Sequence, residues 1–79
     1  MELGQIVWSR AGSDKNNFFV IIGTDDKAVY ISDGKRYKIS APKRKNIKHL
    51  AVTGETLEKE NFSTDKSLRM ALAVFRSQH

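Results

Sequence analysis

The part of the sequence best suited to chemistry is a basic segment without acids. Between Gly34 and Gly54 every charged side chain is a lysine or an arginine, within a chain of net charge +5. Such side chains bind polyanions because they displace the counterions condensed on nucleic-acid phosphates. The alternative is a solvated basic face that serves only solubility. The one-sided placement favours a binding surface made of Lys35, Arg36, Lys38, Lys43, Arg44, Lys45 and Lys48.

We expect the core of this surface to be the run Lys43-Arg44-Lys45. It follows Pro42, which stiffens the chain and lowers the entropy lost when the segment is held against a ligand. The earlier cations of the segment are predicted on a strand, where alternate side chains share a face. A continuous basic face would result, with Arg36 and Lys38 on one side of that strand, opposite Tyr37 and Ile39.

Two further places could contact a polyanion. Arg10 and Lys15 flank Gly12, and either could reach a phosphate, although each is equally well explained as a surface charge. Gly12 itself is interpreted as structural, since glycine permits a positive φ or a close backbone approach at the start of a loop. His49 could stack on a base or contact a phosphate, and the more conservative alternative is a backbone hydrogen bond at a turn.

The remaining polar residues suggest neither catalysis nor metal binding. The chain has no cysteine, which excludes a thiolate zinc site and a cysteine nucleophile. Asp25, Asp26 and Asp33 lack the spacing of a calcium-binding loop and are interpreted as turn acids. No Ser-His-Asp, phosphate-loop or dinucleotide signature occurs. We therefore expect no enzyme activity, no cofactor, no metal and no small-molecule substrate.

The pattern of apolar residues predicts a mainly β fold that would position these side chains. Strands are expected at residues 4–10, 18–22 and 28–32, followed by a fourth around Tyr37 and Ile39 that ends at Pro42, and by a short last strand at residues 50–52 after a turn at 46–49. Asp33-Gly34 is a strong signal for the tight turn before the fourth strand. Four to five short strands at this spacing are typical of a small barrel.

The C-terminal part changes to a helical period. Leu68, Ala71, Leu72 and Phe75 recur on one helix face, so residues 65–77 are predicted to be helical, with Thr64 as N-cap. The second strand is apolar on both faces, and the helix packed on the outside of the barrel would cover its outer face. We expect a single domain with a barrel at 1–54, an exposed polar linker at 55–63 and the helix at 64–79.

Two segments of the chain resemble a known family. Residues 4–15, from Gly4-Gln5-Ile6-Val7-Trp8 through Gly12, run into the apolar strand at 18–22 and look like the KOW motif of ribosomal and transcription-elongation proteins. Ser32-Asp33-Gly34 and the stretch from Pro42 to Leu50 are similar to the large-subunit ribosomal proteins of the L-fourteen-e group in archaea and eukaryotes. Small bacterial KOW proteins are similar over nearly the whole length. Ser13 and Asn17 depart from the basic residue and the second glycine of the family loop, but asparagine tolerates the left-handed conformation.

The resemblance implies an SH3-like barrel that binds RNA, a place on or near the ribosome, and no reaction. Ribosomal or another structured RNA is the expected partner, together with ribosomal or transcription proteins. The rival interpretation is a protein-interaction module of the translation or transcription machinery, which the salt dependence of binding would distinguish. The absence of cysteine fits the cytoplasm. The sequence contains no apolar run of about 18 residues, the length that would suggest a membrane-spanning helix.

Overall fold

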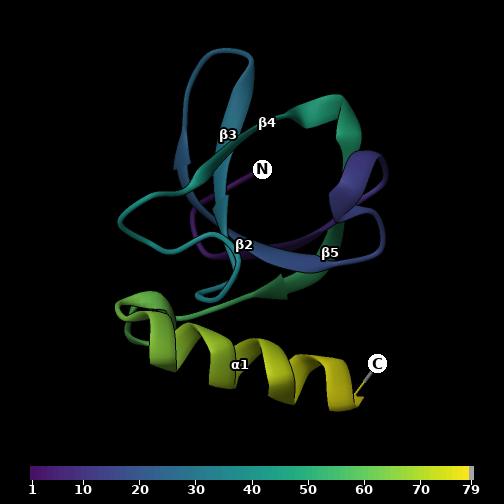
Figure 1. Ribbon diagram of the computed structural model, residues 1–79. Helices are drawn as coiled ribbons and strands as arrows, with labels where there is room; N and C mark the ends of the chain where they lie inside the picture. Colours follow the sequence, from purple (N-terminus) through teal and green to yellow (C-terminus); the bar gives the residue numbers. More distant parts are fainter. Residues whose placement is uncertain (79) are drawn as a thin grey trace.

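Five antiparallel strands form one curved sheet in the computed structural model, which describes residues 1–78 (Figure 1). The sheet has the order β4-β3-β2-β1-β5 and the architecture of a small SH3-like barrel, with the helix α1 along its outside. The edge strands β4 and β5 are joined directly by a 3₁₀ turn. This arrangement confirms the predicted mainly β fold with one C-terminal helix. The strands are β1 Gln5–Ser9, β2 Phe18–Thr24, β3 Ala28–Ser32, β4 Lys43–Asn46 and β5 Leu50–Thr56, and the helix α1 is Asp65–Gln78.

The strand β2 is apolar on both faces because it separates two hydrophobic clusters. Phe19 and Ile21 point into the barrel, where they pack with Val7, Val29, Ile31 and Leu50. Val20 lies on the opposite face with Ile6, against the helix. Since successive side chains of a strand point to opposite faces, one strand contributes to both clusters. The prediction that the helix covers the outer face of β2 is confirmed.

The helix α1 is fixed by its apolar face and its N-terminal cap. Leu68, Leu72 and Phe75 are buried against the barrel, and the ring of Phe75 meets that of Phe18 edge-on at 5.2 Å between centroids. The hydroxyl of Thr64 accepts a hydrogen bond of 3.1 Å from the backbone N–H of Ser67, as the predicted N-cap should. Within residues 1–78, no helix combines the length and apolarity needed to cross a membrane.

The predicted fourth strand around Tyr37 and Ile39 is wrong, because these residues lie in a loop. Asp33 starts the turn as predicted, but its carboxylate accepts the backbone N–H of Tyr37 at 3.0 Å. The N–H of Ile39 donates to the carboxylate of Asp65 in the helix at 2.8 Å, so it is not available to β3. The strand that pairs with β3 begins after Pro42 instead of ending there. It is β4, with the sequence Lys-Arg-Lys-Asn, whose polarity gave no strand signal.

The connection from β5 to the helix is only partly the exposed linker that was expected. The strand β5 continues to Thr56, and a 3₁₀ turn follows at Lys59–Phe62. Glu58 and Glu60 are exposed, but Leu57 and Phe62 are half-buried and pack against the cluster under the helix. The two apolar residues therefore attach the connection to the domain.

Candidate nucleic-acid interface

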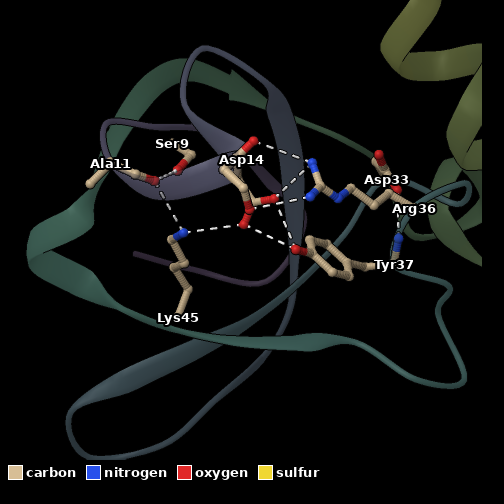
Figure 2. A network of polar contacts seen from close by, with 8 residues as sticks. Ser9, Ala11, Asp14, Asp33, Arg36, Tyr37 and Lys45 are labelled. Carbon is tan, nitrogen blue, oxygen red and sulfur yellow. Dashed lines mark hydrogen bonds and ion pairs between the residues drawn. The ribbon is translucent and has the colours of Figure 1, made fainter.

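A buried carboxylate, Asp14, joins three separate segments at one end of the barrel. It ends the 3₁₀ turn Gly12–Asp14 and is only 2% exposed. Figure 2 shows the hydroxyl of Tyr37, the amino group of Lys45 and the guanidinium of Arg36 converging on it. Tyr37 donates at 2.8 Å, and the Lys45 and Arg36 nitrogens each lie 3.2 Å from a carboxylate oxygen. The loop after β1, the loop after β3 and the strand β4 are thus held together by one acid.

The environment of Asp14 favours its charged form. Burial alone would raise the pKa of this carboxyl, but hydrogen bonds from Tyr37 and Lys45, and the charges of Lys45 and Arg36, outweigh burial and lower the pKa below its ordinary value of 3.8. For Tyr37, burial and the hydrogen bond to the Asp14 carboxylate raise the pKa above 10.0. Asp14 is therefore ionised near neutral pH and Tyr37 keeps its proton.

Lys45 does not have the exposed position expected for the core of the binding surface. Its side chain is 12% exposed, and its amino group contacts the backbone carbonyl of Ala11 at 3.4 Å in addition to Asp14. A lysine that satisfies a buried carboxylate is unavailable to a phosphate unless that contact breaks. Lys45 therefore supports the loops in this structure, and its assignment to the binding surface stays a prediction.

Arg36 and Arg44 are also paired with acids, but they remain accessible. The Arg36 side chain is 46% exposed, and its guanidinium donates to the hydroxyl and carbonyl oxygens of Ser13 beside the Asp14 pair. Arg44 is 60% exposed and lies 3.1 Å from Asp25. The backbone N–H of Lys27 and the Arg44 guanidinium lower the pKa of Asp25 to about 2. Both arginines could meet a ligand at their free faces, with part of their charge already neutralised.

The remaining cations of the basic segment are exposed and have no acidic partner among residues 1–78. The amino group of Lys43 lies 5.9 Å from the centre of the Tyr37 ring, which is a cation–π contact. This contact holds the Lys43 charge near the Asp14 network. The charge that the segment can offer to a polyanion is therefore smaller than its composition suggests. It resides chiefly on Lys35, Lys38, Lys43 and Lys48.

The loop after β1 lies beside the turn that joins β4 and β5. The backbone N–H of Arg10 donates to the carbonyl oxygen of His49 at 2.8 Å, which brings the exposed Arg10 next to the exposed His49 and Lys48. The exposed Lys15 belongs to the same loop. The backbone of His49 thus has a structural contact, and its imidazole remains accessible to solvent.

Two residues shape this loop by adopting the left-handed conformation. Gly12 has a φ of +78°, which confirms its structural role. The asparagine that adopts this conformation is Asn16, with a φ of 72°, and not Asn17. Asparagine adopts this conformation more readily than most residues because its short polar side chain can form local hydrogen bonds. The loop therefore keeps its shape without a second glycine.

Asp14 is the important residue that the sequence did not reveal. It stands in a polar loop among glycine, serine, lysine and asparagine, where an acid is normally exposed. Its three side-chain partners are 22 or more positions away in the chain, so no local spacing indicates them. The one available signal is that it is the only acid between Glu2 and Asp25.

No group of three histidine or acidic side chains suited to a metal ion occurs in the described chain. The chain matches no protein-family model and no curated protein. The likeness to KOW proteins therefore rests on the motifs in the sequence.

Proposed function

We propose that this chain is a KOW-type domain that binds structured RNA through phosphate contacts, without catalysis. The observation that carries the proposal is the set of exposed lysines in the acid-free segment, which have no acidic partner among residues 1–78. Phosphate groups would supply the missing anions, and each contact would release condensed counterions. Lys35, Lys38, Lys43 and Lys48 are the proposed principal contacts, with Arg10, Lys15, Arg36, Arg44 and His49 at their margins.

The Asp14 network supports the proposal because it fixes the loops before any ligand arrives. Arg36 and Tyr37 belong to the loop after β3, Lys45 belongs to β4, and all three are tied to one buried carboxylate (Figure 2). A binding surface that is ordered in advance loses less conformational entropy on association. The paired cations would thus contribute by positioning the unpaired ones.

The resemblance to KOW proteins favours RNA over duplex DNA, and the proposed contacts do not use the helix. The apolar face of α1 packs against the barrel, where Leu68, Leu72 and Phe75 are buried. The helix therefore stabilises the barrel. Lysine-bearing loops can follow the shape and phosphates of folded RNA without reading base pairs in a groove. The resemblance to ribosomal proteins makes ribosomal RNA the first candidate.

Paired titrations test this function. The full chain should bind an RNA hairpin more tightly than a DNA hairpin of the same sequence at one moderate salt concentration, as measured by fluorescence anisotropy. Equal or tighter binding to DNA would reduce the domain to a nonspecific polyanion binder. Failure to bind either hairpin would contradict the proposal and favour the protein-interaction module.

A further inference from the structure

A second feature of the surface is an apolar hollow of about 480 Å³ on the outside of the barrel. The strands β2 and β3 form its floor through Ile22, Gly23 and Tyr30. The loop before β4 contributes Ile39 and Pro42, and the connection to the helix contributes Lys59, Phe62 and Ser63. The hollow is separate from the Asp14 network, and the RNA-binding surface described above does not include it.

The aromatic ring of Tyr30 is held in place in this hollow. Tyr30 stands opposite Gly23 in the register of β2 and β3, so no side chain from β2 covers it at that position. A Cβ atom at position 23 would lie 3.3 Å from the ring. The phenol hydroxyl donates to Asp25 at 3.1 Å, and the same carboxylate oxygen accepts from Arg44. The hydrogen bond to Asp25 therefore holds the ring at its hydroxyl end while the ring lines an open hollow.

Two cations lie beside the hollow. Lys59 is the only charged side chain among its lining residues. Lys43 does not face the hollow, because it stands opposite Ile31 of the barrel interior in the register of β3 and β4 and lies over the Tyr37 ring. Arg44 stands opposite Tyr30 in the register of β3 and β4. The apolar, aromatic wall of the hollow thus has two cations beside it, Lys59 and Arg44.

We propose that this hollow receives one unpaired nucleobase, stacked on the ring of Tyr30, while Lys59 and Arg44 contact the flanking phosphates. The inference rests on the proposed RNA binding and adds a preference for RNA with an unpaired nucleotide. Every base has a flat π face, and stacking on an aromatic side chain is sequence-tolerant. The combination of an aromatic ring with Lys59, which has no acidic partner within residues 1–78, favours a nucleotide over an apolar peptide, which would leave that charge unpaired.

The test compares two RNA hairpins that carry the same number of phosphates. One contains a single bulged adenosine, and the other has an abasic nucleotide at that position. The full chain should bind the bulged adenosine about 5- to 150-fold more tightly, which is the range that one stacked base contributes. Tyr30→Leu should abolish this preference because it removes the ring. The matched control Tyr30→Phe keeps the ring and loses only the hydroxyl, so it should retain the preference.

The outcomes separate this inference from the proposed function. Equal affinity of the natural chain for both hairpins would overturn the base site and leave the proposed RNA binding intact. Should Tyr30→Leu fail to fold, this comparison with the natural chain is sufficient by itself. A Tyr30→Leu variant that weakens binding to both hairpins equally would assign the ring a structural role. Loss of all RNA binding would remove the proposed function itself. If a proline-rich peptide, and not RNA, changed the NMR chemical shifts of the residues that line the hollow, the hollow would be a protein-binding site. That result would also overturn the inference.

Discussion

Replacing Leu72 with alanine is expected to lower the free energy of unfolding by about 2–5 kcal/mol, the cost of removing a large side chain from a tightly packed core. Leu72 is fully buried and packs in the cluster with Ile6, Val20, Leu68 and Phe75. This cluster attaches the helix face to β1 and β2, together with the contact between Phe75 and Phe18. The cavity left by Leu72→Ala would therefore weaken the contact between helix and barrel, and urea denaturation measures the loss.

The matched control for Leu72→Ala is Met70→Ala in the same helix. Met70 is 61% exposed, so its loss should change the free energy of unfolding by no more than about 0.5 kcal/mol. Deletion of residues 64–79 should lower both the melting temperature and the solubility, because it uncovers the outer face of β2. A deletion that left both unchanged would contradict the packing of the helix on the barrel.

The variant Asp14→Asn is expected to lose about 1.5–3 kcal/mol of stability at pH 7, the range for hydrogen bonds that involve a charged group. The amide keeps the shape of the side chain but loses the charge that pairs with Lys45 and Arg36. Lys45 is nearly buried and would be left without a counter-charge. Since Asp14 holds three segments together, the loops of the proposed interface should also exchange their amide hydrogens faster.

The stability of the natural chain should depend on pH through the same carboxyl. The pKa of Asp14 is lower in the folded state than its ordinary value of 3.8, so the folded state binds this proton less readily than the unfolded state. The stabilisation is complete above the unfolded pKa and is lost as the pH falls through the folded pKa. The stability difference between the natural chain and Asp14→Asn should therefore shrink on acidification from pH 5 to pH 2.

The control for this charge effect is Asp26→Asn. Asp26 is exposed and makes no side-chain hydrogen bond or ion pair within residues 1–78. Its replacement should have little effect on stability at pH 7. A difference between the natural chain and Asp14→Asn that stayed constant down to pH 2 would mean that the Asp14 charge does not stabilise the fold.

Local patterns in the sequence predicted the elements whose stability comes from regular burial. The strand β2 is a continuous apolar run, and the helix repeats Leu68, Leu72 and Phe75 on one face, so both could be identified without the structure. The strand β4 could not, because none of its residues is apolar and its place depends on hydrogen bonds to β3. Tyr37 suggested a strand by its type, but the side chain of Asp33 satisfies its backbone in a loop.

The sequence predicted that the candidate site is positively charged, but it did not predict which of its cations pair with acids. The absence of acids between Gly34 and Gly54 identified a basic surface. The acids that neutralise part of it, Asp14 and Asp25, come from earlier in the chain and reach Lys45 and Arg44 only through the fold. Composition therefore could not separate the cations that hold the loops from those that are free to meet a ligand.

The salt dependence of RNA binding tests the central claim most directly, through a variant with Lys43→Gln and Lys48→Gln. These lysines are exposed and have no acidic partner among residues 1–78, so the fold should remain intact. Each lost phosphate contact flattens the plot of log affinity against log salt by about 0.7 to 0.9, so the double variant should lose about 1.4 to 1.8 of slope. The control with Lys27→Gln and Arg76→Gln removes the same charge outside the basic segment and should keep nearly the full slope. An unchanged slope for the Lys43 and Lys48 variant, with a flattened slope for the control, would contradict the account by assigning RNA to another face of the protein.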